Sequence, residues 1–428
     1  MKLATLKDGS RDGMLAVVSR DQKTAHLTDG IAPTLQRALD DWPFIAPQLE
    51  DLALQLNSGR ARRSFEFVPA NCMAPLPRAH QWIDASVYEQ HVELLTRVYS
   101  GKLPDNLWRE PMMYQGGSDD FLGPCDSAVF AEEHWGIDFE PELGVILGDT
   151  PMQVRKDDAL DQVRLLVLIN DWSLRNLIAA EIGKSFGFLQ SKPATGFAPL
   201  AVTPDELGLA WAGGLAHLGV AADWNGVRFM HANAGVGTRF SFTELIVHAA
   251  KTRNLRAGTI IGSGTVSSGG NVGCVAELRA REALEAADDK GKPGRARTDF
   301  MKFGDRVRIE AFDAAGFSVF GAIDQEVVSL RKRRAPGAAH EQRQSDLSAA
   351  DEAPAAASAT EPYVLQATPA ENDAAEVSLA AAAAMAPAAD ATASAAADAT
   401  ASAAAPAPQA PAPETPVPGP DAAPPQSA

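Results

Sequence analysis

The amino-acid sequence predicts a β-rich α+β body with a small β/α module before it and a disordered tail after it. Three observations support this prediction. Residues 78–330 contain short runs of alternating polar and apolar side chains, and these strands do not alternate regularly with helices as in a doubly wound parallel sheet. Pro75-Leu76-Pro77 interrupts the chain between the module and the body. Beyond residue 334 the composition shifts to Ala and Pro. We therefore expect domains at 1–70, 75–330 and 335–428.

The N-terminal module is expected to hold three short strands and an interrupted helix. Asp-Gly pairs at residues 8–9 and 29–30 are turn signals between apolar runs. Residues 34–56 repeat apolar side chains at spacings of three and four, which is typical of a helix. Pro43 and Pro47 lie between two such sets and predict a break or two helices. The expected strands are Lys2–Leu6, Leu15–Ser19 and Thr24–Thr28.

The main body shows local signals for two hairpins and one helix. Asn225-Gly226 favours a type I′ turn, because both positions of that turn need a positive φ. Ser241 and Glu244 form a capping-box pattern before a helix expected at Leu245–Ala250. Alternation over residues 307–311 and again over 317–321, around a turn at 313–316, predicts a second hairpin.

The tail accounts for most of the net charge of −17. Residues 335–428 hold 12 acidic residues and one basic residue, Arg343, together with 38 alanines and 14 of the 29 prolines. Such a composition cannot bury enough apolar surface to offset chain entropy, so we expect this tail to be disordered and to carry no direct chemistry.

Composition also excludes several classes of function. The body has no basic excess, so sequence-independent binding to nucleic acid is not expected. No apolar run is long enough for a membrane helix, and the N-terminus lacks the apolar core of a signal peptide. Three cysteines lie far apart in the sequence and suggest neither a disulfide framework nor a zinc knuckle, which fits a cytoplasmic protein.

Acidic residues form the first candidate site. In an extended strand Asp138, Glu140 and Glu142 would point to one face, where like charges repel unless a cation or a proton relieves them. Oxygen ligands of this kind favour Mg²⁺, Ca²⁺ or Mn²⁺. The alternative is the solvated face of an edge strand, with which Pro141 is compatible.

A second carboxylate, Asp171, follows the buried apolar run 165–169, and Arg175 lies four residues further on. Asp171 could face a cleft at the end of that strand. Equally, Asp171 and Arg175 could be a helix cap with its i,i+4 ion pair.

Lys184 lies within Gly-Lys-Ser-Phe-Gly at 183–187, a string that resembles two familiar motifs. A P-loop would need glycine at position 178, which is Ile178. A nucleophile elbow around Ser185 would need a strand before it, whereas residues 177–182 look helical, so a serine esterase is a distant alternative. Lys184 either holds an anionic substrate or is an ordinary surface lysine.

His91 is expected on a helix, seven residues after Asp84. It could act as a general base near neutral pH, or it could be a structural histidine. The glycine-rich stretch at 262–267 lacks the third glycine of a dinucleotide fingerprint, so a nicotinamide cofactor is not expected.

Taken together in this order, these segments resemble the fumarylacetoacetate hydrolase family over residues 75–328. The resemblance implies a mixed β-roll catalytic domain, a homodimer and a small N-terminal domain. Single motifs are weak, but the ordered set is specific. Besides the residues above, it includes Tyr114-Gln115-Gly116-Gly117-Ser118, Asp138-Phe139-Glu140-Pro141-Glu142-Leu143, Asn170-Asp171-Trp172-Ser173-Leu174-Arg175, Gly262-Ser263-Gly264-Thr265-Val266 and Cys274-Val275-Ala276-Glu277.

By residue-wise carry-over, the resemblance also implies the roles of individual side chains. A divalent cation, Mg²⁺ or Ca²⁺ with Mn²⁺ as a further option, would be bound by four carboxylates. His91 would be the general base and Glu277 would orient it or the attacking water. Lys184 and Arg175 would hold anionic oxygens of the substrate, Thr265 with Gly264 would meet a carboxylate, and Tyr114 would line the pocket. The implied metal ligands are Asp84, Glu140, Glu142 and Asp171.

The implied activity is metal-dependent hydrolysis of a C–C bond in a small anionic β-diketo acid. Fumarylacetoacetate is the favoured substrate, with acylpyruvates as one alternative and decarboxylation or isomerisation of a 2-oxo acid as another. Three positions that line the site in fumarylacetoacetases differ here. They are Ser86, Ile178 and Phe188 in place of tyrosine, glutamine and threonine.

Overall fold

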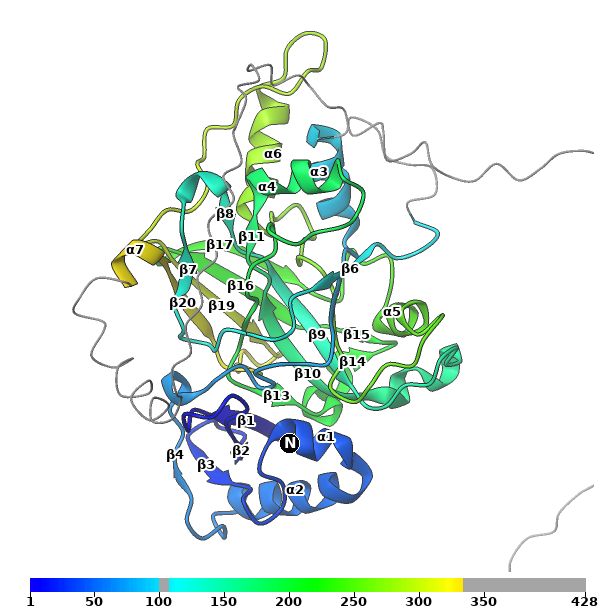
Figure 1. The fold of residues 1–428 in the computed structure, drawn as a ribbon, viewed down its shortest axis with the longest axis vertical. Helices are drawn as coiled ribbons and strands as arrows, with labels where there is room; N and C mark the ends of the chain where they lie inside the picture. Colours follow the sequence, from blue (N-terminus) through cyan, green and yellow to red (C-terminus); the bar gives the residue numbers. More distant parts are fainter. Residues whose placement is uncertain (100–107, 334–428) are drawn as a thin grey trace, which may run out of the picture. The chain divides into compact units, whose positions relative to one another are not determined.

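The computed structural model describes residues 1–99 and 108–333. The predicted tail at 335–428 lies outside the described residues. The described part is a sheet-rich α+β structure, as the sequence predicted, and it contains two main sheets (Figure 1). Within the described part, the helices are too short or too polar to cross a membrane.

The larger sheet has 11 strands and joins the N-terminal module to the body. Its order is β4-β3-β2-β1-β13-β10-β9-β18-β5-β6, with β12 also paired to β10. Within this sheet β18 pairs with β5 in parallel, and the other strand pairs of the described residues are antiparallel. The strands are β1 (Lys2–Leu6), β2 (Met14–Val18), β3 (Thr24–Leu27), β4 (Phe65–Glu66), β5 (Trp82–Ala85), β6 (Met113–Gly116), β9 (Pro141–Leu147), β10 (Val163–Asn170), β12 (Gly196–Phe197), β13 (Ala201–Val202) and β18 (Ile260–Gly262).

The N-terminal module matches its sequence prediction closely. Two helices, α1 (Leu35–Asp40) and α2 (Trp42–Asn57), are separated at Asp41, and Pro43 lies in the first turn of α2, where its missing N–H costs nothing. Apolar residues of these helices share one core with Leu165, Val167 and Ile169 of β10. The module is therefore packed against the sheet that carries the site.

The smaller sheet has the order β17-β16-β19-β20-β7. The Asn225-Gly226 turn connects β16 to β17 with φ values of 52° and 77°, as predicted. The expected hairpin around 313–316 is present only as an antiparallel bridge between Phe312 and Ser318, because the chain turns again at Gly321 (φ 72°) before β20 pairs with β19. The strands are β7 (Ala128–Phe130), β16 (Gly219–Trp224), β17 (Val227–Asn233), β19 (Arg306–Phe312) and β20 (Ile323–Ser329).

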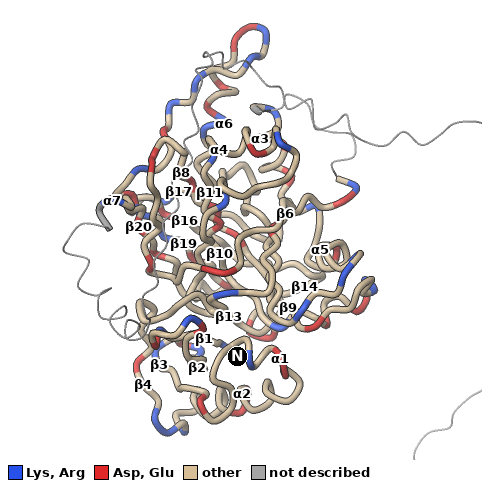
Figure 2. Tube along the Cα trace, viewed as in Figure 1, with Lys and Arg blue, Asp and Glu red and all other residues tan. Residues whose placement is uncertain are grey.

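Helices α3, α4 and α6 gather at one end of the sheets in Figure 1, and α3 packs against α6. Helix α5 begins with the predicted capping box of Ser241 and Glu244, three residues earlier than expected. Acidic and basic residues are interspersed along the described trace (Figure 2). The helices are α3 (Glu89–Tyr99), α4 (Arg175–Ile182), α5 (Phe242–Ala249), α6 (Val275–Glu285) and α7 (Leu330–Arg333); two-stranded pairs are formed by β8 (Ile137–Asp138) with β11 (Ser173–Leu174) and by β14 (Trp211–Ala212) with β15 (Leu215–Ala216).

The acidic segment 138–142 differs from the single edge strand considered above. It is split into β8 and β9 at Phe139 and Glu140, and β9 lies between β10 and β18 inside the larger sheet. Pro141 opens β9, a position that tolerates a missing N–H. All five residues are buried, so the solvated-edge alternative is wrong.

Candidate active site

Three buried carboxylates meet in the larger sheet where β10, β9, β18 and β5 follow one another. Asp84 is on β5, Glu142 is on β9 opposite Ile169 of β10, and Asp171 directly follows β10. One oxygen from each lies within 4.8 Å of the others. Gly262 of β18 leaves the necessary room, because a Cβ there would lie 2.5 Å from Asp84 Oδ1.

Glu142 is the member of this group that most needs a cation. Both its carboxylate oxygens are buried, and neither has a hydrogen-bond partner among the described residues. Burial and the charge of Asp84 hold the pKa of Glu142 well above its usual range, and burial with the charge of Asp171 raises the pKa of Asp84 to about 8. An all-oxygen set of this charge fits a divalent cation such as Mg²⁺, Ca²⁺ or Mn²⁺.

Glu140, the fourth predicted ligand, is not part of this group and faces cations instead. Its Oε1 accepts hydrogen bonds from Arg175 at 2.7 Å and from Thr265 Oγ1 at 2.7 Å. Its Oε2 accepts from Lys192 Nζ at 2.6 Å and Ser173 Oγ at 3.0 Å. Burial opposes its charge, but the charges of Arg175 and Lys192 hold the pKa of Glu140 well below its usual range.

Lys192 is the site lysine that the sequence reasoning missed. Its Nζ lies 2.6 Å from Asp171 Oδ2 as well as from Glu140, and its side chain is 8% exposed. Burial opposes its charge, but Asp171 and Glu140 raise the pKa of Lys192 above its usual value. It is therefore a fixed positive charge beside the carboxylate group.

Lys184, by contrast, is exposed on the loop after α4 and does not line the cavity described below. The placement of a substrate-holding lysine at Lys184 is therefore corrected to Lys192. Lys184 stood out because Gly-Lys-Ser resembles a phosphate loop. Lys192 lies between Ser191 and Pro193 without a motif, and only its position before the buried strand β12 could have drawn attention to it.

Asp171 and Arg175 do not form the helix cap considered as an alternative. The cap position of α4 is Leu174. Asp171 instead accepts hydrogen bonds from Tyr114 OH at 2.5 Å and Thr195 Oγ1 at 3.0 Å, in addition to Lys192. Tyr114 thus lies in the site as predicted.

Gln325 of β20 holds the residues on both sides of Asp171. Its Oε1 accepts from Trp172 Nε1 at 2.9 Å and from Asn170 Nδ2 at 3.2 Å, while its Nε2 donates to Gly123 O at 3.0 Å. Gln325 is fully buried, so these are the bonds that satisfy its amide away from water.

His91 and Glu277 form a buried pair that joins α3 to α6. His91 Nδ1 lies 2.6 Å from Glu277 Oε1. The second oxygen of Glu277 accepts from Ser267 Oγ at 2.7 Å and from Gly273 N at 3.0 Å. With Nδ1 donating to Glu277, the other ring nitrogen of His91 keeps a lone pair, and His91 lines the cavity.

Asp138 connects Arg175 with helix α6, which carries Glu277, the partner of His91. Its carboxylate accepts from the N–H groups of Val275 and Ala276 at 2.8 and 2.9 Å, in the first turn of α6. The same carboxylate accepts from Arg175 Nε at 2.8 Å. Because Glu277 follows in that same first turn, Asp138 fixes Arg175 and Glu277 relative to each other.

Gly264 and Thr265 follow β18 and complete the wall next to Asp84. Gly264 adopts a positive φ of 82°, and its N–H donates to Asp84 Oδ1 at 3.1 Å. A Cβ at this position would lie 2.3 Å from Ala85 O, so the close approach requires glycine. Both residues line the cavity, and the contact with a substrate carboxylate stays a prediction.

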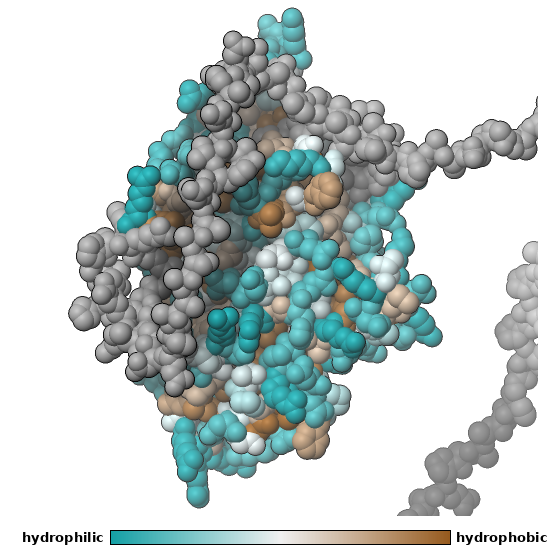
Figure 3. Space-filling model, in the orientation of Figure 1, coloured by the Kyte–Doolittle hydropathy of each residue, from teal (hydrophilic) through white to brown (hydrophobic). Residues whose placement is uncertain are grey.

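These groups surround a cavity of about 350 Å³, a volume suited to a small organic ligand. One side is polar and the other is apolar. Hydrophobic side chains are visible on the face of the molecule where α3 and α4 lie (Figure 3). The lining residues include Asp84, His91, Tyr114, Glu140, Arg175, Lys192, Gly264 and Thr265 on the polar side, and Leu95, Met112, Ile178, Ile182, Phe188 and Ala276 on the apolar side.

Ser185, the nucleophile of the serine esterase alternative, is exposed on the loop after α4. It has a positive φ of 59°, but a helix rather than a strand precedes it. A nucleophile elbow requires the opposite order, so the geometry gives the esterase alternative no support.

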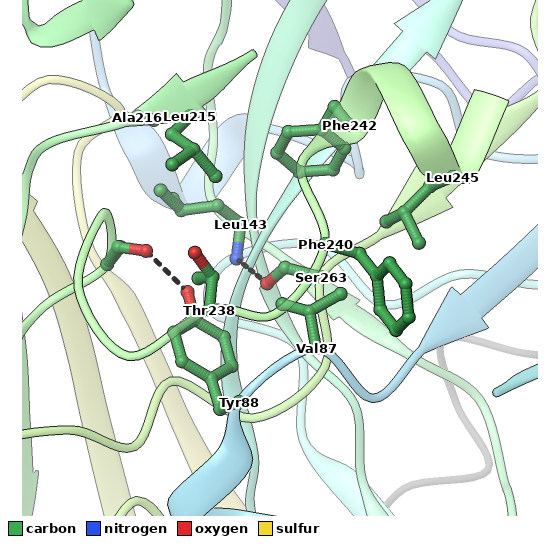
Figure 4. A pocket seen from close by; sticks show the side chains of 11 residues that line it. Val87, Tyr88, Leu143, Leu215, Ala216, Thr238, Phe240, Phe242, Leu245 and Ser263 are labelled. Atoms are coloured by element: carbon green, nitrogen blue, oxygen red, sulfur yellow. Dashed lines mark hydrogen bonds between the residues drawn. The ribbon is translucent and has the colours of Figure 1, made fainter. Parts of the chain in front are cut away.

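A second cavity, lined by Tyr88, Leu143 and Ser263 among others, has a volume of only about 10 Å³ (Figure 4). Its walls are mostly apolar, and its polar groups pair with each other: Tyr88 OH donates to Ala234 O at 2.8 Å, and Leu143 N donates to Ser263 Oγ at 3.3 Å. This volume barely admits one water molecule. The region serves to fix the segments after Asp84 and before Gly264.

The fold and the site define an α+β protein in which Asp84 of the carboxylate group and His91 of the His–Glu pair line one cavity. Residues 81–328 match the family model described as fumarylacetoacetate (FAA) hydrolase C-terminal, and residues 1–78 match that described as fumarylacetoacetase N-terminal domain 2. The chain therefore belongs to the fumarylacetoacetate hydrolase family.

Similar proteins in this family carry different activities. The chain is 29% identical over 205 residues to 2,4-didehydro-3-deoxy-L-rhamnonate hydrolase of Sphingomonas sp. (strain SKA58), covering 46% of this chain and 68% of that protein. It is 27% identical over 160 residues to the mitochondrial oxaloacetate tautomerase fahd2 of Xenopus laevis, covering 37% and 48%. The fold resembles maleylpyruvate hydrolase from Sphingobium sp. SYK-6, solved with manganese(II) and pyruvate, with a TM-score of 0.52, 18% identity and coverage of 77% and 99%.

The substitution Glu142→Gln tests the carboxylate group as a cation site. It removes a buried acid that lies beside the like-charged Asp84 and Asp171 and has no hydrogen-bond partner among the described residues, so we expect the metal-free protein to unfold at a higher temperature than the parent. Added Mn²⁺ should stabilise the parent by several degrees and leave the variant unchanged. Thermal unfolding with EDTA and with Mn²⁺ measures both effects. Equal stabilisation of the two proteins would contradict the site.

The substitution Asp138→Asn tests the connection between Arg175 and α6. Asparagine keeps the shape but loses the charge that faces Arg175 and the helix N-terminus, so we expect a loss of about 2 kcal/mol in the free energy of unfolding. Asp299→Asn, which breaks an exposed ion pair with Lys302, is the matched control and should change little. Denaturant titration checks both. A loss no larger than that of the control would contradict the role of Asp138.

Proposed function

We propose that the protein is a divalent-metal-dependent hydrolase that cleaves a C–C bond of a small β-diketo acid. The observation that carries the proposal is the cavity lined by Asp84, His91, Arg175 and Lys192. Asp84 belongs to the oxygen-only carboxylate group, His91 is paired with Glu277, and Arg175 and Lys192 are fixed cations. Fumarylacetoacetate and the acylpyruvates are both acids of this class. A homodimeric state and a cytoplasmic location stay predictions.

The residues of the chain divide the chemistry between them. A divalent cation held by Asp84, Glu142 and Asp171 would polarise the substrate carbonyl and neutralise developing charge. His91, whose Nδ1 is held by Glu277, is placed to take a proton from the attacking water through its other ring nitrogen.

Arg175 and Lys192 supply the positive charge that a substrate carboxylate or enolate needs. Each is paired with Glu140, and their side chains are 8% exposed. Because they are already fixed by these ion pairs, little reorganisation is needed when negative charge develops on the leaving fragment. Tyr114 and Thr265 add hydroxyl groups beside them.

A second candidate function uses the same cavity without hydrolysis. The similarity to an oxaloacetate tautomerase favours proton transfer at the carbon between two carbonyl groups. In that case His91 would move the substrate proton itself. Turnover of a 2-oxo acid without C–C cleavage would distinguish this activity from the hydrolase.

A substrate panel tests the proposal directly. The full chain loaded with Mg²⁺ or Mn²⁺ should cleave at least one of fumarylacetoacetate and an acylpyruvate, followed by loss of the diketo-acid absorbance. EDTA should abolish the reaction, and His91→Ala should lower kcat by roughly 10²- to 10⁴-fold. Insensitivity to EDTA, or cleavage of no diketo acid by the metal-loaded protein, would overturn it.

Lys192→Met and Lys184→Met form a matched pair for the lysine assignment. Loss of a preorganised cation in the cavity should lower kcat/KM by about 10²-fold or more in the first variant. The second variant changes an exposed side chain and should keep the parent rate. Steady-state kinetics on the best substrate of the panel compares them. A large loss at Lys184 with none at Lys192 would restore the assignment made from the sequence.

A further inference from the structure

The cavity lining changes from polar to apolar along helices α3 and α4, each of which contributes its polar residue from its first turn. On α3, His91 lies in the first turn and Leu95 lies one turn further along the same face. On α4, Arg175 is the first residue, and Ile178 and Ile182 follow on the same face. At a rise of about 1.5 Å per residue, Ile182 lies roughly 10 Å along the helix from Arg175.

The charged groups are confined to the polar end. Among the described residues that line the cavity, the cationic side chains of Lys and Arg are Lys192 and Arg175, and both contact Glu140. The apolar end is lined by Leu95, Met112, Ile178 and Ile182. A carboxylate placed against those side chains would lose its water without gaining an ionic partner.

The loop after α4 extends the apolar side towards Tyr114. The Phe188 ring packs edge-on against the Tyr114 ring, with the centroids 5.3 Å apart. Glu181 holds this loop, because its carboxylate accepts from the N–H groups of Leu189, Gln190 and Ser191. The apolar wall therefore has a fixed position relative to the polar groups.

We infer, on the basis of the proposed function, that the substrate is an acid with an apolar alkyl or aryl group at the end opposite its dicarbonyl and carboxylate unit. The polar unit lies at the carboxylate group with Arg175 and Lys192. The apolar group lies along Leu95, Ile178 and Ile182. Acylpyruvates with an extended acyl chain fit this arrangement, whereas fumarylacetoacetate carries a second carboxylate at the far end.

Binding of simple 2-oxo acids tests this inference without requiring turnover. With the full chain loaded with Mn²⁺, affinity should rise about threefold to fourfold per added methylene from 2-oxohexanoate to 2-oxononanoate, because these methylenes extend beyond the dicarbonyl position and each leaves water. Isothermal titration calorimetry measures the series. Affinities that stay equal across the series, or a 2-oxo dicarboxylate of the same length that binds more tightly, would overturn the inference.

Turnover measurements are the second test, and they distinguish the apolar subsite from the proposed hydrolase activity. Hexanoylpyruvate should have a kcat/KM at least about tenfold above that of acetylpyruvate and of fumarylacetoacetate. If fumarylacetoacetate is the best substrate, the inference fails and the proposed hydrolase stands. If the 2-oxo acid series shows the methylene dependence but no diketo acid is cleaved, the proposed function fails and the apolar subsite stands.

Ile178→Gln and Ile182→Ala locate the effect on α4. Each should reduce the gain in affinity per added methylene. Leu54→Gln, an exposed apolar side chain of α2, is the matched control and should keep the full dependence. Melting temperatures near that of the parent verify that the variants are folded. If affinity depends on chain length in both α4 variants as it does in the parent, Ile178 and Ile182 do not form the apolar subsite.

Discussion

The cost of burying the Glu142 carboxylate beside two other acids is the constraint on which the surrounding structure depends. Within the described chain this carboxylate has no hydrogen-bond partner, and Asp84 and Asp171 bring two more acids beside it. A like-charged group of this kind is costly away from water. The neighbouring acids are compensated, Asp171 by Lys192 and Glu140 by Lys192 and Arg175, so the uncompensated position is left where a cation would bind.

The same requirement explains why the site draws on so many elements. Asp171 directly follows β10, Glu142 is the second residue of β9 and Asp84 is on β5, and their side chains meet because these strands are held in one sheet. Asp138 then couples α4 to α6, and α6 supplies Glu277 to His91 on α3. The reacting groups are thus positioned by buried hydrogen bonds between regular elements, which favours a preorganised site.

Local signals in the sequence predicted local structure well. The Asn225-Gly226 turn, the capping box at Ser241 and the break before Pro43 each depend on a few neighbouring residues, and each appears in the structure. The return strand after residue 316 is shorter than predicted, a single bridge between Phe312 and Ser318. The chain turns at Gly321, where a Cβ would lie 2.7 Å from Pro199 Cγ, and no local pattern encodes this tertiary approach.

Composition and periodicity alone would have predicted few residues of the candidate site. Most were predicted because several motifs occur in the same order as in a known family. That comparison failed at Lys184, where a conspicuous Gly-Lys-Ser string outweighed Lys192, a residue without a motif. The separation of Glu140 from the three-carboxylate group depends on tertiary contacts with Arg175 and Lys192. Spacing along one strand could not reveal it, since the strand is broken between Asp138 and Pro141.

Gln325 makes the packing around Asp171 depend on a residue that is synthesised late. It lies on β20, near the end of the body, and its amide satisfies groups on both sides of Asp171. During synthesis on the ribosome, the strands that carry the acids emerge long before this glutamine does. The acidic centre therefore cannot reach its final packing until almost the whole body has been translated, and an incomplete chain would leave Trp172 and Asn170 without their buried partner. Most site residues are synthesised early. We nevertheless expect the site to form in a nascent chain only after the last strands of the body have been made.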